Sequence, residues 1–260
     1  MVDMTGTMSS LLIDFYVKSA GMAHLWLNQL IKLPILENIK SLRVRCIALN
    51  ALTTYYTELW GELWSEDYRL EQWSQSNNPR LSRDFFSNLT PIWQRNCAIR
   101  SDFGRRLALI EIDVIVAQAI GLSLDELLLI YKVQFPVMQG YERDTWFDMT
   151  GHIIFTNSKS LVGVGLPRRG GRLTGDVTIS KSDGVNVTQK FGWDDIKRMQ
   201  DEGNLPEGTV ITTSLTDDTH PGGPITRECK YVAPFSLASR EDDYRIAWAF
   251  FESQKSETQH

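Results

Sequence analysis

The residues with the clearest potential for chemistry form a basic, glycine-rich stretch at residues 158–175, which contains no acidic residue. Its basic residues are Lys159, Arg168, Arg169 and Arg172, and its glycines include Gly163, Gly165, Gly170 and Gly171. Glycine lets a backbone approach a surface closely. Lysine and arginine contact DNA phosphates, and arginine also hydrogen-bonds guanine edges. The stretch is therefore a candidate DNA-binding site, and the alternative interpretation is a mobile surface hairpin.

Catalytic motifs are missing from the rest of the sequence. The segment GVGLPRRGG lacks the spacing of a dinucleotide-binding loop and of a P-loop. Neither H-E-x-x-H nor G-x-S-x-G occurs. Asp217, Asp218 and His220 could bind a metal, but a loop that continues into Pro and Gly is more typical of a turn. We predict no catalytic, cofactor-binding or metal-binding residue in this chain.

The elements that must position the basic stretch centre on residues 104–137. Apolar residues at helical spacing indicate one helix, which Gly121 ends. Ser123 and Glu126 form a capping-box pattern that begins a second helix, and Phe135-Pro136 ends it. Within the first helix, Glu111 and Asp113 are two apart and face different directions, so an acid pair for hydrolysis is not expected. The pattern predicts a core helical hairpin on which neighbouring segments pack.

Further elements follow from periodicity along the chain. Helices are predicted at residues 9–18, 38–64, 193–200 and 240–253, and a short one within residues 81–92, before Pro91. Strands are predicted at residues 151–156, 176–180, 209–214 and 231–235. Together they predict an α+β fold, mainly helical in the N-terminal half, with a smaller mixed α/β C-terminal region. We divide it into a recognition-like segment at 1–36, a helical core domain at 37–150 and a mixed α+β region at 151–260.

Two groups of residues near these helices have roles that the helical periodicity does not determine. The basic residues Arg95, Arg100, Arg105 and Arg106 gather near the start of the central helix. Because cations oppose the dipole there, they suggest a role outside that helix, with a solvated face as the alternative. The second group is the apolar run Leu25, Trp26, Leu27, Leu30, Ile31 and Leu33. We predict that it packs on residues 38–64 and leaves an exposed apolar edge for upstream sequence or a partner.

Composition narrows the class of protein. The net charge of −5 does not favour a free-standing nucleic-acid binder. The three cysteines, Cys46, Cys97 and Cys229, are far apart in sequence, which indicates reduced thiols and neither a disulfide framework nor a zinc site. We find no uncharged apolar stretch long enough for a spanning helix and no secretory signal. A cytoplasmic protein without a membrane partner is expected.

Two blocks resemble large single-chain adenine-specific DNA methyltransferases, including type IIG restriction-modification enzymes and phage-defence methylases. The first, SSLLIDFYVKSAGMAHLWLNQLIKLPIL, is similar to the end of their target-recognition region, through His24-Leu-Trp-Leu-Asn28 and Ile31-Lys-Leu-Pro34. On residues alone, His24 and Asn28 are either polar ligand readers or a satisfied half-buried histidine with its neighbour. The second, RRLALIEIDVIVAQAIGLSLDELLLIYKVQFPVMQGYE, looks like the C-terminal helical segment of that family. DDTHPGGPITRECKYVAPF and REDDYRIAWAFFE resemble tails of its phage-defence branch.

The resemblance implies a DNA-recognition and structural module whose catalysis lies elsewhere. The family methylates adenine N6 with S-adenosylmethionine and holds the flipped base with an N-P-P-[YF] motif, which this chain lacks; its Asn78-Pro79-Arg80-Leu81 cannot substitute. The expected partners are therefore DNA and a catalytic methyltransferase chain or upstream domain, which would bind the cofactor. A protein-interaction scaffold without DNA contact, and an orphaned fragment, are the alternatives.

Overall fold

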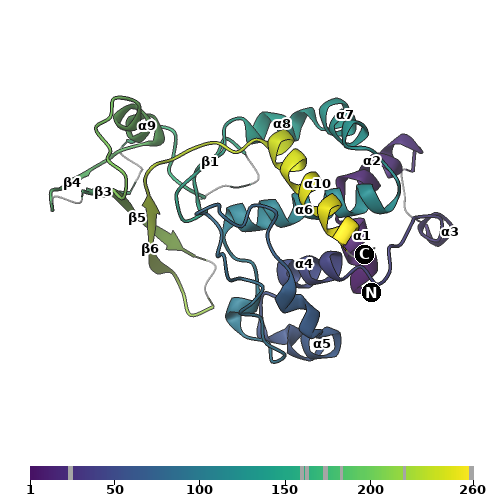
Figure 1. Cartoon of the computed structure of the whole chain (residues 1–260). Coiled ribbons are helices and arrows are strands. Elements are labelled where there is room, and N and C mark those ends of the chain that lie inside the picture. Colours follow the sequence, from purple (N-terminus) through teal and green to yellow (C-terminus); the bar gives the residue numbers. More distant parts are fainter. Residues whose placement is uncertain are drawn as a thin grey trace. The chain divides into compact units, whose positions relative to one another are not determined.

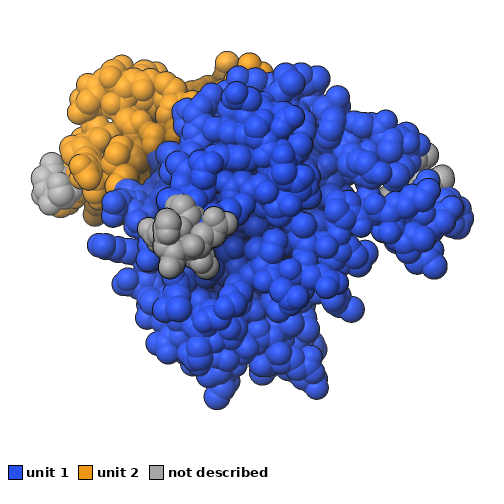
Figure 2. All heavy atoms as spheres, turned by 45° about the vertical axis from the view of Figure 1, so that its right-hand side comes forward, with its two compact units in different colours: residues 1–139, 239–260 blue, residues 140–238 orange. Residues whose placement is uncertain are grey.

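The computed structural model describes residues 1–22, 26–158, 161, 164–171, 175–181, 184–218 and 221–257. The chain forms two compact units (Figure 2): unit 1 comprises residues 1–139 and 239–260, and unit 2 comprises residues 140–238. The final helix therefore belongs with unit 1, although the sequence placed it in the segment 151–260. The helices and small antiparallel sheets of the described residues confirm the α+β prediction.

Unit 1 is helical (Figure 1). Its helices are α1 (Val2–Met8), α2 (Leu11–Ser19), α3 (Leu27–Leu30), α4 (Lys40–Asn50), α5 (Thr57–Leu63), α6 (Asp102–Ala119), α7 (Leu124–Gln134) and α10 (Arg240–Glu257). Short 3₁₀ turns cover Thr54–Tyr56, Glu66–Leu70 and Arg95–Cys97. The boundary with unit 2 falls within α8 (Pro136–Glu142). None of these helices, within the described residues, is long and apolar enough to cross a membrane.

The central helix α6 confirms the predicted core hairpin. It packs against α4, α7 and α10, and it is buried along most of its length. Gly121 adopts a φ of 83°, a conformation that favours glycine, and follows the end of α6. The Ser123 hydroxyl accepts a hydrogen bond from the Glu126 amide, and the Glu126 carboxylate accepts one from the Ser123 amide, which is the predicted capping box.

The predicted helix at residues 38–64 is wrong as a single element, since α4 ends at Asn50 and α5 begins only at Thr57. Side chains from distant residues hydrogen-bond the carbonyls at the break. Arg105 donates to Leu49 O at 2.9 Å, and Arg100 donates to Leu52 O at 2.7 Å. Two of the arginines gathered near the start of α6 therefore hydrogen-bond the break after α4, which is a structural role outside α6.

The short helix predicted before Pro91, within residues 81–92, is also wrong, because this segment is a series of turns. Tryptophan indoles hydrogen-bond carbonyls of these turns. Trp73 Nε1 donates to Ser82 O at 3.2 Å, and Trp60 Nε1 donates to Thr90 O at 2.8 Å. The expected aromatic cluster is present: the ring centroids of Trp73 and Phe86 lie 5.0 Å apart.

The apolar run near the N-terminus has the predicted exposed edge. Trp26, Leu27 and Ile31 are 68%, 76% and 74% exposed, whereas Leu33 is buried. Leu25 and His24 lie outside the described residues. The edge is therefore a surface feature of unit 1, whereas the packing of the run on residues 38–64 and the covering of the edge stay predictions.

The described residues of unit 2 form two antiparallel sheets and the helix α9 (Trp193–Asp201), besides the end of α8. The small sheet pairs β1 (Trp146–Phe147) with β2 (Ile153–Phe155), and the larger sheet has the order β4-β3-β5-β6. Its strands are β3 (Val177–Ser180), β4 (Asn186–Gln189), β5 (Val210–Asp217) and β6 (Ile225–Val232). The strand predicted at 231–235 begins earlier, at Ile225, and ends at Val232, before Pro234, a residue type that cannot donate a ladder hydrogen bond.

The core of unit 2 forms where helix α9 (Trp193–Asp201) buries its apolar face. Trp193 and Ile196 are buried with the inward-facing strand residues Ile179 and Ile211. Phe155 of β2 is stacked on Trp193, with ring centroids 5.6 Å apart and 5° between the ring planes. The described segment 164–171 of the basic stretch, between β2 and β3, runs past this aromatic core.

Candidate functional site

The structure describes two of the four predicted DNA-binding residues. Arg168 and Arg169 lie in the described segment 164–171, whereas Lys159 and Arg172 lie outside the described residues. Of the potential metal ligands, His220 is likewise outside, and Asp217 is paired with Arg227 at 2.8 Å. The described residues hold no group of three or more His, Cys, Asp or Glu side chains that could share a metal ion.

Backbone hydrogen bonds hold residues 164–171, here called the arginine segment, on both sides. The Leu166 amide donates to Ile154 O at 2.6 Å, which joins the segment to β2. The Trp193 amide donates to Pro167 O at 2.8 Å, and the Asp194 amide donates to Arg168 O at 3.0 Å. These last two amides belong to the first turn of α9, where helix N–H groups have no partner inside the helix. The segment thus accepts hydrogen bonds from the first-turn N–H groups of α9, and these bonds hold the segment in place.

Two glycines allow this close packing. Gly165 adopts a φ of 71°, and a Cβ there would lie 2.3 Å from Ile154 O. A Cβ on Gly170 would lie 1.6 Å from Lys190 O. By contrast, a Cβ on Gly171 would have nothing within 4 Å. Gly165 and Gly170 therefore serve contacts inside unit 2, and the described part of the stretch is an anchored segment.

Arg168 is held in a defined orientation. Its guanidinium carbon lies 4.7 Å from the centroid of the Phe155 ring, so the cation sits over the aromatic face. Its Nη2 donates to Asp144 Oδ2 at 2.6 Å, and its Nη1 lies 3.8 Å from Asp194 Oδ1. The side chain remains 51% exposed. An aromatic face and a carboxylate thus fix the guanidinium while part of it still faces solvent.

Arg169 differs sharply from its neighbour. Its side chain is 87% exposed, and its Nε lies 3.9 Å from Asp194 Oδ2, beyond hydrogen-bond distance. An exposed ion pair of this kind contributes little to stability. Arg169 is therefore available to an external anion at small cost.

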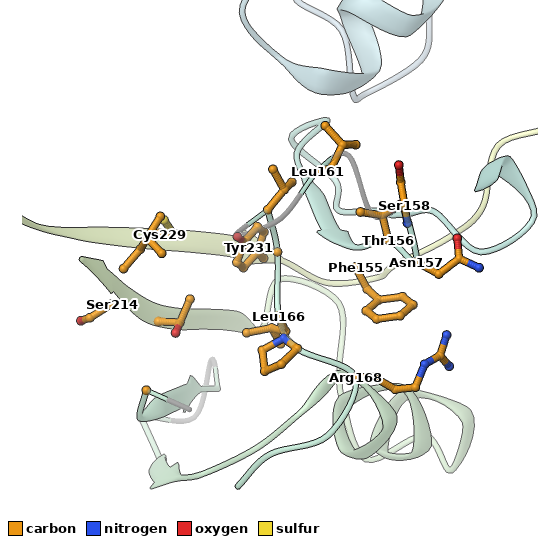
Figure 3. Close-up of a pocket in the computed structure, with 16 residues that line it drawn as sticks. Phe155, Thr156, Asn157, Ser158, Leu161, Leu166, Arg168, Ser214, Cys229 and Tyr231 are labelled. Carbon is orange, nitrogen blue, oxygen red and sulfur yellow. Dashed lines mark hydrogen bonds between the residues drawn. The ribbon is translucent and has the colours of Figure 1, made fainter. Parts of the chain in front are cut away.

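A cavity of about 590 Å³ lies beside Arg168 (Figure 3). Its polar lining includes Asn157, Ser158, Thr213 and Ser214, and Leu166 and Leu215 contribute apolar surface. Figure 3 draws Asn157 and Arg168 on either side of the Phe155 ring. The lining offers hydroxyl, amide and guanidinium groups, which bind ligands by hydrogen bonds.

Sequence reasoning missed the polar lining residues of this cavity that lie outside the basic stretch. Thr213 and Ser214 lie in a run of hydroxyl residues on β5, which gave the only available signal. Asn157 follows β2 by two residues and belongs to no motif.

The chain has no counterpart in the comparisons. Protein-family models, curated proteins and solved structures give no match. Any function must therefore be inferred from the residues and their geometry.

Glu111 and Asp113 of α6 lie in two separate buried clusters, as their spacing predicts. Glu111 Oε2 accepts a hydrogen bond from Arg45 Nε at 2.5 Å. Asp113 Oδ2 accepts one from the Tyr244 hydroxyl at 2.7 Å and lies 3.3 Å from Arg240 Nη1. Burial raises the pKa of Asp113, and the charge of Arg240 opposes that rise. Each acid is occupied by partners within unit 1, so we assign both a structural role.

The cysteines are free thiols, as predicted. Cys46 and Cys97 are buried, and Cys229 is partly buried. Burial raises the pKa of Cys46 to about 11, which keeps this thiol protonated near neutral pH. Cys46 therefore behaves as a small core residue and not as a nucleophile.

Proposed function

We propose that this protein is the DNA-recognition and structural module of an adenine-N6-specific DNA methyltransferase of a restriction-modification or phage-defence system. The observation that carries the proposal is the pair of neighbouring arginines: Arg168 is held over an aromatic ring beside a polar cavity, and Arg169 is largely exposed. Such side chains supply the phosphate and base contacts of DNA-binding proteins. The sequence resemblance gives the kind of system.

The charge balance limits how such a module would act. A net charge of −5 provides no general attraction for DNA, so contact must come from a local basic surface. The arginine segment supplies part of that surface, and Lys159 and Arg172 belong to the same stretch of sequence. Binding by the isolated chain is expected to be weak and to depend steeply on salt.

The first prediction tests DNA contact by Arg169. Arg169→Ala should lower the slope of log affinity against log salt by about 0.9, because one phosphate contact is lost. The measurement is a titration of a fluorescent duplex with the purified chain, starting at about 50 mM salt, where such contacts are strong. Arg245→Ala is the matched control, since Arg245 in unit 1 is also exposed and flanked by acids. If the parent chain binds no duplex at low salt, the proposal fails.

A second prediction concerns catalysis. Methyl transfer is assigned to a separate chain or domain, because the cofactor and base-holding motifs of the family are missing from this sequence. Calorimetry should therefore detect no saturable binding of S-adenosylmethionine to the purified chain, and a plasmid should gain no methyl groups. Either signal would contradict this division of labour.

A protein-interaction scaffold is the second candidate. The exposed side chains Trp26, Leu27 and Ile31 favour it, because soluble monomers rarely expose contiguous large apolar groups. The acidic net charge also favours it. This candidate becomes the better one if the duplex titration shows no binding.

A further inference from the structure

We propose that Arg168 reads the edge of a guanine in the major groove, whereas its neighbour Arg169 neutralises a phosphate. This inference rests on the proposed DNA-recognition function and adds a specificity-determining residue to it. It predicts that the DNA target contains a G·C pair recognised through Arg168.

The first step is the rigidity of the platform under Arg168. Phe155 is only 3% exposed, and its ring stacks on buried Trp193 at 5.6 Å. The guanidinium carbon lies 4.7 Å from the Phe155 centroid, so the cation rests on the core of unit 2. A side chain that is already ordered loses less conformational entropy when it binds. Base readout gains from this order, because two hydrogen bonds must form in a fixed geometry.

The second step concerns the hydrogen-bond donors that remain. The guanidinium has five N–H groups, and Asp144 takes one hydrogen of Nη2. Nη1 lies 3.8 Å from Asp194, too far for a hydrogen bond. Four N–H groups are therefore left: one on Nε, two on Nη1 and one on Nη2. The remaining Nη2 hydrogen forms a fork with an adjacent N–H, either on Nη1 or on Nε. Guanine presents two acceptors in the major groove, O6 and N7, and this fork is the group that matches them.

The third step is the local charge. Asp144 and Asp194 flank Arg168 and compensate its positive charge. A phosphate approaching Arg168 would meet two carboxylates, which repel it. A neutral base edge meets no such repulsion and still accepts the hydrogen bonds. Arg169, 87% exposed and without a hydrogen bond to Asp194, is the better phosphate ligand of the two.

The experiment selects preferred sites from a random duplex library with the full chain, then compares variants on the selected site. The parent should enrich a motif with a G·C pair. Arg168→Lys keeps the charge but loses the planar fork, so it should reduce the preference for that pair by about 5- to 150-fold. Affinity for unrelated DNA and the salt slope should stay unchanged. Arg169→Ala should lower the salt slope by about 0.9 and keep the sequence preference.

Asp144→Asn provides a second variant, because it weakens the hydrogen bond that orients the Arg168 guanidinium and leaves Arg168 itself in place. It should weaken the same preference to a smaller extent, and a thermal melt checks that both variants stay folded. The inference is overturned if Arg168→Lys keeps the parental preference, if it lowers the salt slope as Arg169→Ala does, or if the parent binds duplexes without any preference. Each of these three outcomes would still be compatible with the proposed DNA-recognition function. Failure of the parent to bind any duplex instead removes the proposed function itself.

Discussion

Replacing Arg45 with Met should destabilise unit 1 by about 3–5 kcal/mol, because it leaves a buried carboxylate without its partner. The side chains of Arg45 and Glu111 are both fully buried. Arg45 Nε donates to Glu111 at 2.5 Å, and its Nη1 donates to Glu71 at 2.8 Å. Its Nη2 also donates to Gln72 O at 2.7 Å. Met fills similar space but supplies none of these donors. Chemical unfolding followed by far-ultraviolet circular dichroism measures the loss in helical unit 1.

Two variants separate buried charge from lost packing. Lys40→Met removes an exposed ion pair with Asp67 and should change the unfolding free energy by no more than about 0.5 kcal/mol. Adding Glu111→Gln to the Arg45→Met variant should restore part of the loss, since the neutral amide can still accept from the Ser74 amide. A double variant no more stable than Arg45→Met alone would show that packing, and not the stranded charge, determines the cost.

Local signals account for what the sequence predicted correctly. The hairpin of α6 and α7 is encoded by apolar periodicity, by Gly121 and by the Ser123–Glu126 capping box. Each of these signals lies within a few residues of the feature it specifies. The same is true of α9 and α10, whose apolar and acidic patterns gave both their existence and their approximate bounds.

Long-range hydrogen bonds account for the helices that were predicted wrongly. Residues 38–64 have helical periodicity throughout, yet Arg100 and Trp93 hydrogen-bond the carbonyls of Leu52 and Ala51. Arg100 lies 48 residues from Leu52 in sequence, and Trp93 lies 42 residues from Ala51. The sequence of residues 38–64 contains no signal for these hydrogen bonds. Tertiary contacts therefore override the helical preference of this segment.

The candidate site also combines a feature with a local sequence signal and features set by residues distant in sequence. Sequence composition identified the basic stretch but treated Arg168 and Arg169 alike. Their difference arises from Asp144, 24 residues before Arg168, and from the aromatic ring of Phe155. The polar cavity was also invisible, because β5 and the segment after β2 contribute its lining only once the sheet has formed.

The largest effect in unit 2 is expected from Gly170→Ala. A Cβ on Gly170 would lie 1.6 Å from Lys190 O and 2.6 Å from the Lys190 carbonyl carbon. Both atoms belong to the backbone, so no side-chain rotation can relieve the clash. The arginine segment must therefore separate from residues 190–192. We expect a loss of at least about 2 kcal/mol, within the usual range for overpacking.

Gly171→Ala is the matched control for this loss, because its Cβ would have nothing within 4 Å. It should change stability by no more than about 0.5 kcal/mol. Hydrogen exchange measured by mass spectrometry on peptides covering β3 and α9 reports the opening of unit 2. Separation of the segment would also free the Trp193 and Asp194 amides, since their acceptors are Pro167 O and Arg168 O. Gly170→Ala should therefore speed exchange at the first turn of α9 most of all. Equal exchange in the two variants would mean that the segment is not anchored by this contact, and the fixed geometry of Arg168 would lose its support.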